Sequence, residues 1–532
     1  MKAQAGERPV TLDTEDRAGI AKLATALRSA GYDAKRIRPM LRADSESLTP
    51  RPSDVPIIVR LLPNGDPLAT LLRLFLLSLP VPIAEARAAL SPLTIEHALR
   101  LGIVRRSPGG LESTVRLLPA GDLVIACDRS PESAPDLAAD HVMGVASSSV
   151  FLASLTVRHP IERALDIGCG NGIQAVLAAR HAQRVVACDV NPRALNFTLF
   201  NGSLNGVDNI ECRAGSFFDP VAGETFDLIV SNPPFVISPE NRVVFRDSGL
   251  GGDAVTRQVV REAPAHLREG GLAFVLGSWG VREGEGWPDP LRPWVADLPC
   301  DVWALHHSSD VPLMYAASWN SPLQGRAAEY SAALDRWSEY LAGLGFASIA
   351  YGAFILRRRS GAPNWVRFDD LRGQREPASG DQIAELIAAQ DYLAGLHDDR
   401  QLLDARLTLV REHRLEQLLR AHDGGFEVQS ATLRLESGLR FATSVDAFSA
   451  QLLSRLEGRT LAEAVRDAAA QFAADAIEYS EFESAALRLA KLGLALGFVR
   501  LVNATDGASV APLGRMAGGG DGNGSGSDDI TP

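Results

Sequence analysis

Ala164-Leu165-Asp166-Ile167-Gly168-Cys169-Gly170-Asn171-Gly172 decides the fold, because an apolar run changes here into a turn that holds three glycines. Arg163–Ile167 has the apolar character of a buried strand, and Ile173–Arg180 continues as a helix. Glycine lets the backbone turn sharply and approach a ligand without a Cβ in the way. A strand, turn and helix of this kind can serve NAD, FAD, a nucleotide phosphate or no ligand at all.

Three features of this turn distinguish between those ligands. No Gly-Lys-Ser/Thr follows, which excludes a Walker phosphate loop, and Ile173 stands where a dinucleotide site requires glycine. Asp166 would place a carboxylate against the ligand, which suits a cationic amino-acid group and repels pyrophosphate. The next strand, Arg184–Asp189, ends in an acid that could accept both ribose hydroxyls of an adenosine. Each acid alone could be a strand cap, but together they describe S-adenosylmethionine better than a dinucleotide.

Asn232-Pro233-Pro234-Phe235 follows another buried strand, Phe226–Ser231. Two prolines fix the backbone and remove two N–H donors, so the carbonyls nearby stay free to accept hydrogen bonds. The Asn232 amide oxygen and a proline carbonyl can then hold both hydrogens of a planar –NH2 group, with the Phe235 ring stacked beneath it. The alternative is a strand-ending turn, which Asn-Pro commonly starts. Because the glycine turn and both acids precede it in order, we interpret the segment as a seat for an sp2 nitrogen.

The length of the chain, 532 residues, allows about three domains. Residues 1–135 predict a helical, winged-helix-like domain, with helices at Asp16–Ala30, Pro67–Leu77, Ile83–Leu90 and Thr94–Leu101 before a hairpin. Strands and helices alternate from residue 139 to residue 360, which predicts an α/β domain with a doubly wound, seven-stranded sheet. The four strands not yet mentioned are Ile210–Arg213, Gly271–Gly277, Asp301–His307 and Ser348–Arg357, and a helical segment, Ala327–Leu344, separates the last two.

Residues 380–512 predict a second small helical or winged-helix-like domain. We expect Asp381–Ala421 to be helical and to precede a strand pair, Phe426–Leu435 and Leu439–Thr443, and three helices near residues 446–456, 459–474 and 479–495. Thr460 begins one of these helices, with Glu463 as its capping-box partner. Residues 517–532 are rich in Gly, Ser and Asp and are predicted to be disordered.

Composition limits the setting in which the chain works. It has no apolar stretch long enough to span a membrane and no signal-peptide core at its polar N-terminus. Its five cysteines form no CxxC pair, so we expect a cytoplasmic protein without a metal site. The net charge of −12 is unlike that of a free-standing nucleic-acid binder. One stretch is nevertheless basic, and it could form either a local RNA-binding patch or a solvated helix face. Its basic residues are Lys35, Arg36, Arg38, Arg42, Arg51 and Arg60.

Over roughly residues 140–360 these motifs resemble the class I S-adenosylmethionine-dependent methyltransferases, in their Asn-Pro-Pro-aromatic branch. Val236–Glu240 and Arg246–Asp253 are similar to the HemK/PrmC group, especially its eukaryotic and archaeal members. Enzymes of that group methylate a glutamine side chain in translation release factors. The resemblance implies a cofactor site formed by Asp166, Gly168, Gly170, Asp189, Ser216, Phe217 and Asn232, with Ser216 and Phe217 beside the adenine, and a catalytic seat formed by Asn232, Pro233 and Phe235.

Two positions depart from the family pattern. Phe235 replaces the Tyr that is more usual in glutamine methylators, and Phe also occurs in rRNA guanine methylators. Many relatives carry an acid where Ser216 stands. The segment Met143–Leu152 lies where family members close over the cofactor, although its three consecutive serines fit a helix N-terminus equally well.

The sequence therefore favours an N-methyltransferase that acts on a protein glutamine, with a protein of the release-factor kind as partner. The main alternative is methylation of an exocyclic base amine in rRNA, tRNA or DNA, with the N-terminal domain gripping the nucleic acid. A third alternative is a degenerate scaffold without activity, against which the intact motifs argue. The mechanism needs no dedicated general base at the start, because an amide nitrogen loses its proton readily once it is methylated.

Overall fold

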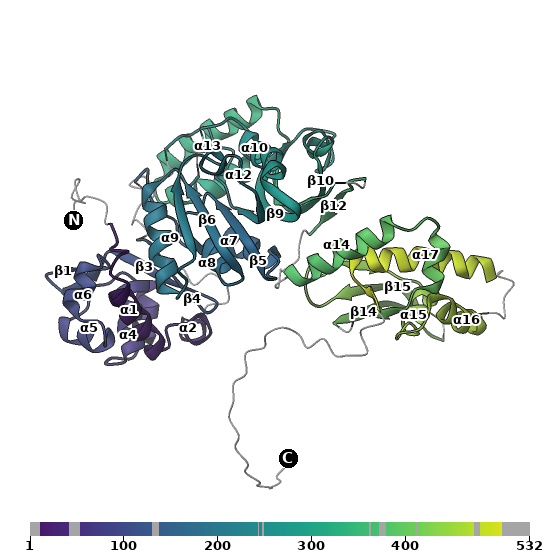
Figure 1. Cartoon of the computed structure of the whole chain (residues 1–532), viewed down its shortest axis with the longest axis horizontal. Coiled ribbons are helices and arrows are strands. Elements are labelled where there is room, and N and C mark those ends of the chain that lie inside the picture. Colours follow the sequence, from purple (N-terminus) through teal and green to yellow (C-terminus); the bar gives the residue numbers. More distant parts are fainter. Residues whose placement is uncertain are drawn as a thin grey trace, which may run out of the picture. The chain divides into compact units, whose positions relative to one another are not determined.

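The computed structural model describes residues 11–41, 54–129, 138–242, 244–246, 249–360, 363–371, 379–410, 412–422, 424–472 and 479–502 (Figure 1). The chain forms two compact units, the first of Met1–Ala384 with Ser437–Arg440 and the second of Glu385–Glu436 with Phe441–Pro532. The first unit includes both the predicted N-terminal and the predicted central domain. The predicted disordered tail at 517–532 lies outside the described residues, as do Arg42 and Arg51 of the basic stretch.

The first unit contains an eight-stranded mixed sheet in the order β12-β10-β11-β9-β8-β5-β6-β7. Its strands are β5 (Ile161–Ile167), β6 (Ala182–Asp189), β7 (Ile210–Ala214), β8 (Phe226–Ser231), β9 (Leu267–Val281), β10 (Cys300–Asp310), β11 (Ser348–Arg358) and β12 (Val366–Asp370). β11 runs antiparallel to both of its neighbours, and the other pairs are parallel. The α/β sheet and all seven predicted strands are confirmed. The eighth strand, β12, was not predicted.

Helices cover both faces of this sheet. Successive side chains of its central strands point to opposite faces, and both faces are buried. Leu165 and Ile167 of β5 belong to a core shared with α10 (Ala254–Glu262) and α11 (Arg292–Val295). Asp166, between them, points the other way and contacts α8. On that face α8 (Ile173–Ala179) packs between α7 (Ser147–Leu155) and α9 (Pro192–Leu204) (Figure 1).

The N-terminal part of the first unit is helical and ends in two hairpins, largely as predicted. Its elements are α1 (Arg17–Ala30), α2 (Ala34–Leu41), α3 (Val55–Leu61), α4 (Pro67–Leu71), a π-helical turn (Leu72–Leu76), α5 (Ile83–Ala89), α6 (Ile95–Arg100), β1 (Val104–Ser107), β2 (Gly110–Ser113), β3 (Val115–Ala120) and β4 (Leu123–Asp128). Their apolar side chains share one core with Phe197 and Phe200 of α9. The helix α9 therefore lies between the N-terminal part and the sheet.

Two asparagine side chains, one on α9 and one at its C-cap, form hydrogen bonds with the backbone of β4 as a neighbouring strand would. Asn201 accepts from the N–H of Ala126 (2.7 Å) and donates to its carbonyl (2.9 Å), and Asn205 does the same with Val124 (3.0 and 2.8 Å). The edge of β4 thus satisfies its backbone groups without a neighbouring strand. Asn201 also donates to the carbonyl of Asn171 (2.8 Å) in the glycine turn, so one buried side chain joins the N-terminal hairpin to that turn.

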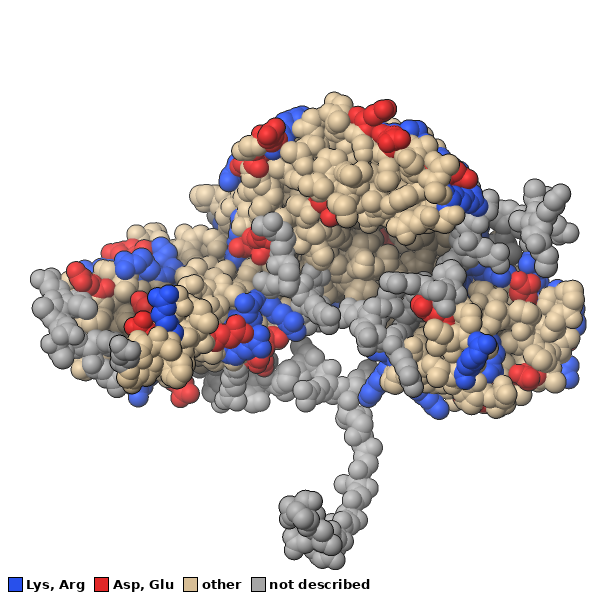
Figure 2. Space-filling model, turned by 180° about the vertical axis from the view of Figure 1, so that it is seen from behind, with Lys and Arg blue, Asp and Glu red and all other residues tan. Residues whose placement is uncertain are grey.

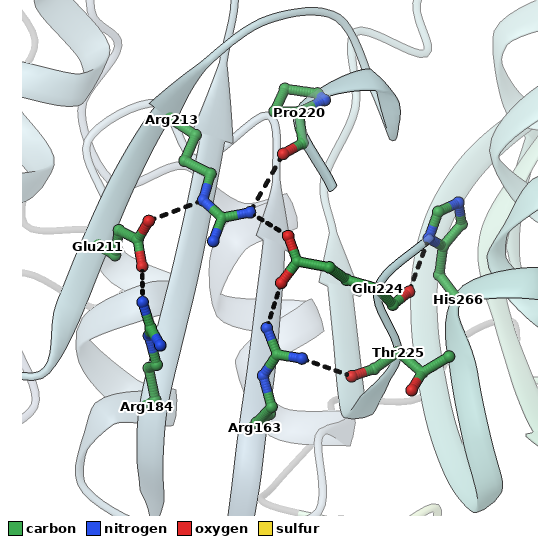
Figure 3. A network of polar contacts seen from close by, with 8 residues as sticks. All are labelled: Arg163, Arg184, Glu211, Arg213, Pro220, Glu224, Thr225 and His266. Carbon is green, nitrogen blue, oxygen red and sulfur yellow. Dashed lines mark hydrogen bonds and ion pairs between the residues drawn. The ribbon is translucent and has the colours of Figure 1, made fainter. Parts of the chain in front are cut away.

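A network of alternating charges joins β5, β6 and β7 to the segment before β8 (Figure 3). Arg213 of β7 lies between Glu211 and Glu224, and Arg184 and Arg163 pair with the outer oxygens of these two acids. Hydrogen bonds from Arg213 come first among the causes that lower the pKa of both glutamates. Since the side chains are only partly buried, each pair contributes ~0–1 kcal/mol to stability.

The second unit combines a three-stranded sheet, β14 (His413–His422), β15 (Gly425–Leu435) and β16 (Ala442–Ser444), with helices. Its other elements are most of α14 (Gly380–Ala394), β13 (Leu407–Leu409), α15 (Ala447–Leu453), α16 (Leu461–Phe472), α17 (Tyr479–Leu496) and β17 (Val499–Leu501). The three C-terminal helices are confirmed, as is the capping box in which Thr460 and Glu463 exchange hydrogen bonds of 2.9 and 3.3 Å. None of the helices in the described ranges is long and apolar enough to cross a membrane.

The prediction of one helix over Asp381–Ala421 is wrong beyond Ala394, apart from a 3-10 turn at Asp399–Asp404. The helix ends at Ala394, and His413–His422 instead forms a strand paired along its length with β15. Its residues Arg414 to Arg420 favour helices by intrinsic propensity, but a turn through Gly424 and Gly425, both at positive φ, returns the chain into a hairpin. Long-range pairing here overrides local preference.

We predict that Asn201→Ala lowers the free energy of unfolding by ~2–4 kcal/mol, because it leaves the buried N–H and carbonyl of Ala126 without partners. Urea unfolding followed by circular dichroism measures the change. Leu199→Ala, at an exposed position of the same helix, is the control and should cost less than ~1 kcal/mol. Equal losses in the two variants would contradict the assignment.

Candidate functional site

A cavity of ≈ 490 Å³ lies at the carboxyl ends of β5, β6, β7 and β8. In open α/β sheets this is the edge where ligands bind, because the loops there converge. The structure brings every predicted site residue to its lining, namely Asp166, Gly168, Gly170, Asp189, Ser216, Phe217, Asn232, Pro233 and Phe235.

The glycine turn lines one side of this cavity. Its three glycines, Gly168, Gly170 and Gly172, all have positive φ. A Cβ added at Gly170 would meet no atom within 4 Å, so glycine there leaves open room beside the backbone. A Cβ at Gly172 would instead lie 2.7 Å from the Thr198 hydroxyl. Gly172 is thus required for packing against α9, whereas Gly170 is favoured by its positive φ and leaves the space beside it open.

The two acids hold the turn in place as well as facing the cavity. Asp166 accepts from the N–H of Ala175 (2.9 Å), and Asp189 accepts from those of Gly170 (2.9 Å) and Asn191 (2.8 Å). Burial raises the pKa of Asp166 to about 7 and also raises the pKa of Asp189. Each carboxylate oxygen keeps a lone pair that these backbone bonds do not use.

Asn232 ends β8 with its amide group in the cavity. Its Nδ2 lies 3.2 Å from the Ser148 hydroxyl and 3.4 Å from the Ser149 hydroxyl, and it donates to both. The Pro233 carbonyl accepts from the N–H of Phe235 (2.7 Å), which uses one of its two lone pairs. The seat therefore offers an amide oxygen and the second lone pair of a proline carbonyl.

Aromatic side chains from distant segments contact the Asn232–Phe235 segment and the residues just after it. The Phe235 ring packs against Tyr351 of β11, with 5.2 Å between the ring centroids. The Tyr315 hydroxyl of α12 (Pro312–Trp319) accepts from the N–H of Ile237 (3.0 Å), just beyond the Asn-Pro-Pro-Phe segment. With α13 (Ala327–Gly343), α12 forms a separate small core under residues 236 and 237.

Sequence reasoning missed several residues of the lining. Asn171 fixes the approach to α7 by donating to the Met143 carbonyl (2.9 Å), and Trp319 reaches the cavity from α12. Asn171 stands inside the glycine motif, which was a usable signal, whereas nothing local marks Trp319. Within the described residues, no three His, Cys, Asp or Glu side chains are grouped to hold a metal ion.

Comparison of the sequence with known proteins identifies the family to which this chain belongs. Residues 144–279 match the model of the methyltransferase small domain. A putative protein N5-glutamine methyltransferase from Methanocaldococcus jannaschii is 30% identical over 140 residues, which are 25% of this chain and 70% of that protein. This chain belongs to the S-adenosylmethionine-dependent methyltransferases. Residues 29–115 and 384–500 match two domain families of unknown function, DUF7059 and DUF7782.

Other relatives of the methyltransferase domain have different substrates in their names. A ribosomal protein uL3 glutamine methyltransferase from Bradyrhizobium diazoefficiens is 33% identical over 159 residues, which are 27% of this chain and 50% of that protein. A ribosomal RNA small subunit methyltransferase C from Escherichia coli is 34% identical over 137 residues, 25% of this chain and 36% of that protein. The chain spans about half the length of the first curated relatives it matches. A solved rRNA methylase from Streptococcus thermophilus is 18% identical and covers 40% of this chain and 95% of its own, with a TM-score of 0.23.

The residues in the cavity fit the family's cofactor. The space beside Gly170 is open, and Asp189 lines the same cavity, where its carboxylate could accept from ribose hydroxyls. Asp166, ionised, would oppose the ammonium of the amino-acid part. Both acids thus lie on the side of the cavity formed by the glycine turn and the end of β6, and Asn232 lies at the end of β8.

We predict that affinity for S-adenosylmethionine falls as the pH drops below about 7, because Asp166 must ionise to oppose the ammonium group. Asp166→Asn should weaken binding near pH 8 and flatten this dependence, as measured by calorimetry from about pH 6 to about pH 8.

Stability of the ligand-free protein should show the opposite trend. A raised folded pKa favours the protonated acid, so its stabilising contribution is complete below the ordinary value of 3.8 and is lost as the pH rises through about 7. Asp166→Asn should remove this loss in thermal unfolding. An unchanged slope in either measurement would exclude Asp166 as the titrating group.

Proposed function

We propose that this protein is an N-methyltransferase that transfers the methyl group of S-adenosylmethionine to the side-chain amide nitrogen of a protein glutamine, as in release factors. The observation that carries the proposal is the orientation of Asn232. Its nitrogen donates to two serine hydroxyls, which directs its oxygen toward the cavity beside the Pro233 carbonyl. Two acceptors at one point match the two hydrogens of a primary amide.

The edge of the cavity favours a protein over a nucleic acid. Met143, Val190 and Val244 line it and are exposed, which gives an apolar rim suited to a polypeptide. Arg246 is the one Lys or Arg among the described residues of the lining, and it pairs with Glu240 at 2.8 Å. Phosphate groups are bound chiefly by Lys and Arg, so this rim lacks the usual contacts for a nucleic-acid backbone.

Charge elsewhere agrees with that preference. On the face drawn in Figure 2, Lys and Arg side chains are interspersed with Asp and Glu. The chain as a whole carries a net charge of −12. Three of the relatives whose names specify a substrate act on glutamine in a ribosomal protein, a release factor or a protein of unstated kind.

The chain's residues would act mainly by positioning. Bound S-adenosylmethionine supplies a methyl group on a sulfonium, which is already an activated leaving group. Asn232 and Pro233 hold the two N–H bonds of the acceptor and stabilise the positive charge that develops on its nitrogen during attack. Phe235 supports the planar amide from below. Holding the nitrogen in line with the methyl group can supply ~7–11 kcal/mol, so no general base is needed at the start.

Methylation of a base amine in RNA or DNA is the second candidate. Its support is the similarity to the rRNA methyltransferase of Escherichia coli, together with Phe235 in place of Tyr. An exocyclic base amine presents the same planar –NH2 group to the seat. The two candidates therefore differ in the macromolecule that carries the nitrogen and share the transfer chemistry.

We expect methyl-labelled S-adenosylmethionine and the full chain to label protein in a cell extract. The label should survive nuclease, disappear with protease, and appear as N5-methylglutamine after complete proteolytic digestion. Added salt should change the rate only modestly, since few phosphate contacts are involved. Label that enters RNA or DNA, with a steep fall in affinity as salt rises, would establish the second candidate.

We expect Asn232→Ala to abolish methyl transfer while cofactor affinity stays within a few-fold, because the side chain acts on the acceptor nitrogen. Calorimetry with S-adenosylmethionine and the labelling assay measure the two quantities separately. Asn241→Ala, at an exposed residue of the same lining, is the control and should retain activity. Lost cofactor affinity with a normal maximal rate would disprove the role of Asn232.

A further inference from the structure

The helix α7 begins with three serines, none of which caps it. Ala146 occupies the N-cap position and makes no side-chain hydrogen bond. Serine hydroxyls in such a place usually satisfy the free N–H groups of the first turn. Here Ser148 and Ser149 line the cavity, while Ser147 is exposed and stands outside the lining. The hydroxyls of Ser148 and Ser149 are therefore available for a contact other than capping.

That contact is with Asn232, more than 80 residues away along the chain. Both hydroxyls meet the same atom, Nδ2, at 3.2 and 3.4 Å. A primary amide has its two N–H donors on one side and its acceptor oxygen on the other. From the residues that the structure describes, no hydrogen bond reaches Asn232 Oδ1. The nitrogen side is thus occupied by protein, and the oxygen side is open to a substrate.

We propose that Ser148 and Ser149 are positioning residues, which hold the Asn232 amide so that its oxygen faces the nitrogen to be methylated. This inference rests on the proposed function and deepens it. If the amide turned over, its own –NH2 would face the –NH2 of the acceptor, donor against donor. The terminal torsion of Asn is broad and roughly two-fold, so rotamer preference alone does not exclude that state. The serine hydroxyls accept from the amide hydrogens and keep them away from the substrate.

The serines are placed by the same elements that form the cofactor side of the cavity. Gln174 of α8 donates to the Ser149 carbonyl (2.8 Å), and Asn171 of the glycine turn donates to the Met143 carbonyl (2.9 Å) just before α7. Both donors are buried. The turn that holds the cofactor side thereby sets the position of α7 and, through its hydroxyls, the orientation of Asn232.

The test compares three variants of the full chain in the labelling assay at saturating cofactor. Ser148→Ala/Ser149→Ala should lower the maximal rate of transfer at least ~10-fold, since one oriented acceptor in the seat is lost, with the Kd for S-adenosylmethionine within two-fold of wild type. Ser147→Ala is the matched control and should leave both quantities unchanged. Ser148→Thr keeps a hydroxyl and should retain most of the rate.

The results that would overturn the proposal differ from those that would overturn the proposed function. An unchanged maximal rate in the double variant rejects it, as does a weakened cofactor Kd that accounts for the whole loss of activity. The side-chain amide resonances of Asn232, assigned by their absence in Asn232→Ala, give a readout that needs no acceptor. They should shift in the double variant and not in Ser147→Ala, even if wild type labels RNA or nothing. Unshifted resonances reject the serine contact.

Discussion

The side chain of Asn201 joins the N-terminal hairpin directly to the glycine turn. It satisfies both backbone groups of Ala126 on β4 and the carbonyl of Asn171 in the turn. The turn contains three glycines at positive φ, a backbone that is costly to order because glycine is so free when unfolded. Bonds from Asn201 and from Asp189 fix that backbone from two sides. The N-terminal hairpin is therefore part of what gives the cavity its shape.

Much of the sheet and the site could be predicted because their signals are local. Each site motif directly follows a strand, and parallel strands bring their carboxyl ends to one edge, so Asp189 and Asn232 had to approach the glycine turn once the sheet was inferred. The seven strands followed from apolar runs that end in Gly, Asp or Pro. Strand β12 was not predicted, because Val366–Asp370 is a half-buried edge strand in which polar and apolar residues alternate and which therefore lacks an apolar run.

The parts that could not be predicted depend on contacts between distant residues. The strand β14 has the composition of a helix and becomes a strand by pairing with β15. The contact of Ser148 with Asn232 joins the first turn of α7 to the segment that follows β8, and the packing of α7 on α8 helps to set this approach. Trp319 belongs to an insertion between β10 and β11, and only the folded position of α12 brings it to the cavity. The sequence around each of these residues does not predict such long-range contacts.

The distribution of titratable groups separates the two halves of the site. The proposed nitrogen seat consists of Asn232, Pro233 and Phe235 with two serine hydroxyls, and none of these groups changes charge near neutral pH. Both acids, with pKa values raised by burial, lie on the cofactor side. A cation close to such a buried acid favours its ionised form and therefore lowers its pKa. Under the proposed function, pH would therefore act on cofactor binding, while the orientation of the acceptor nitrogen would depend on hydrogen bonds between uncharged groups.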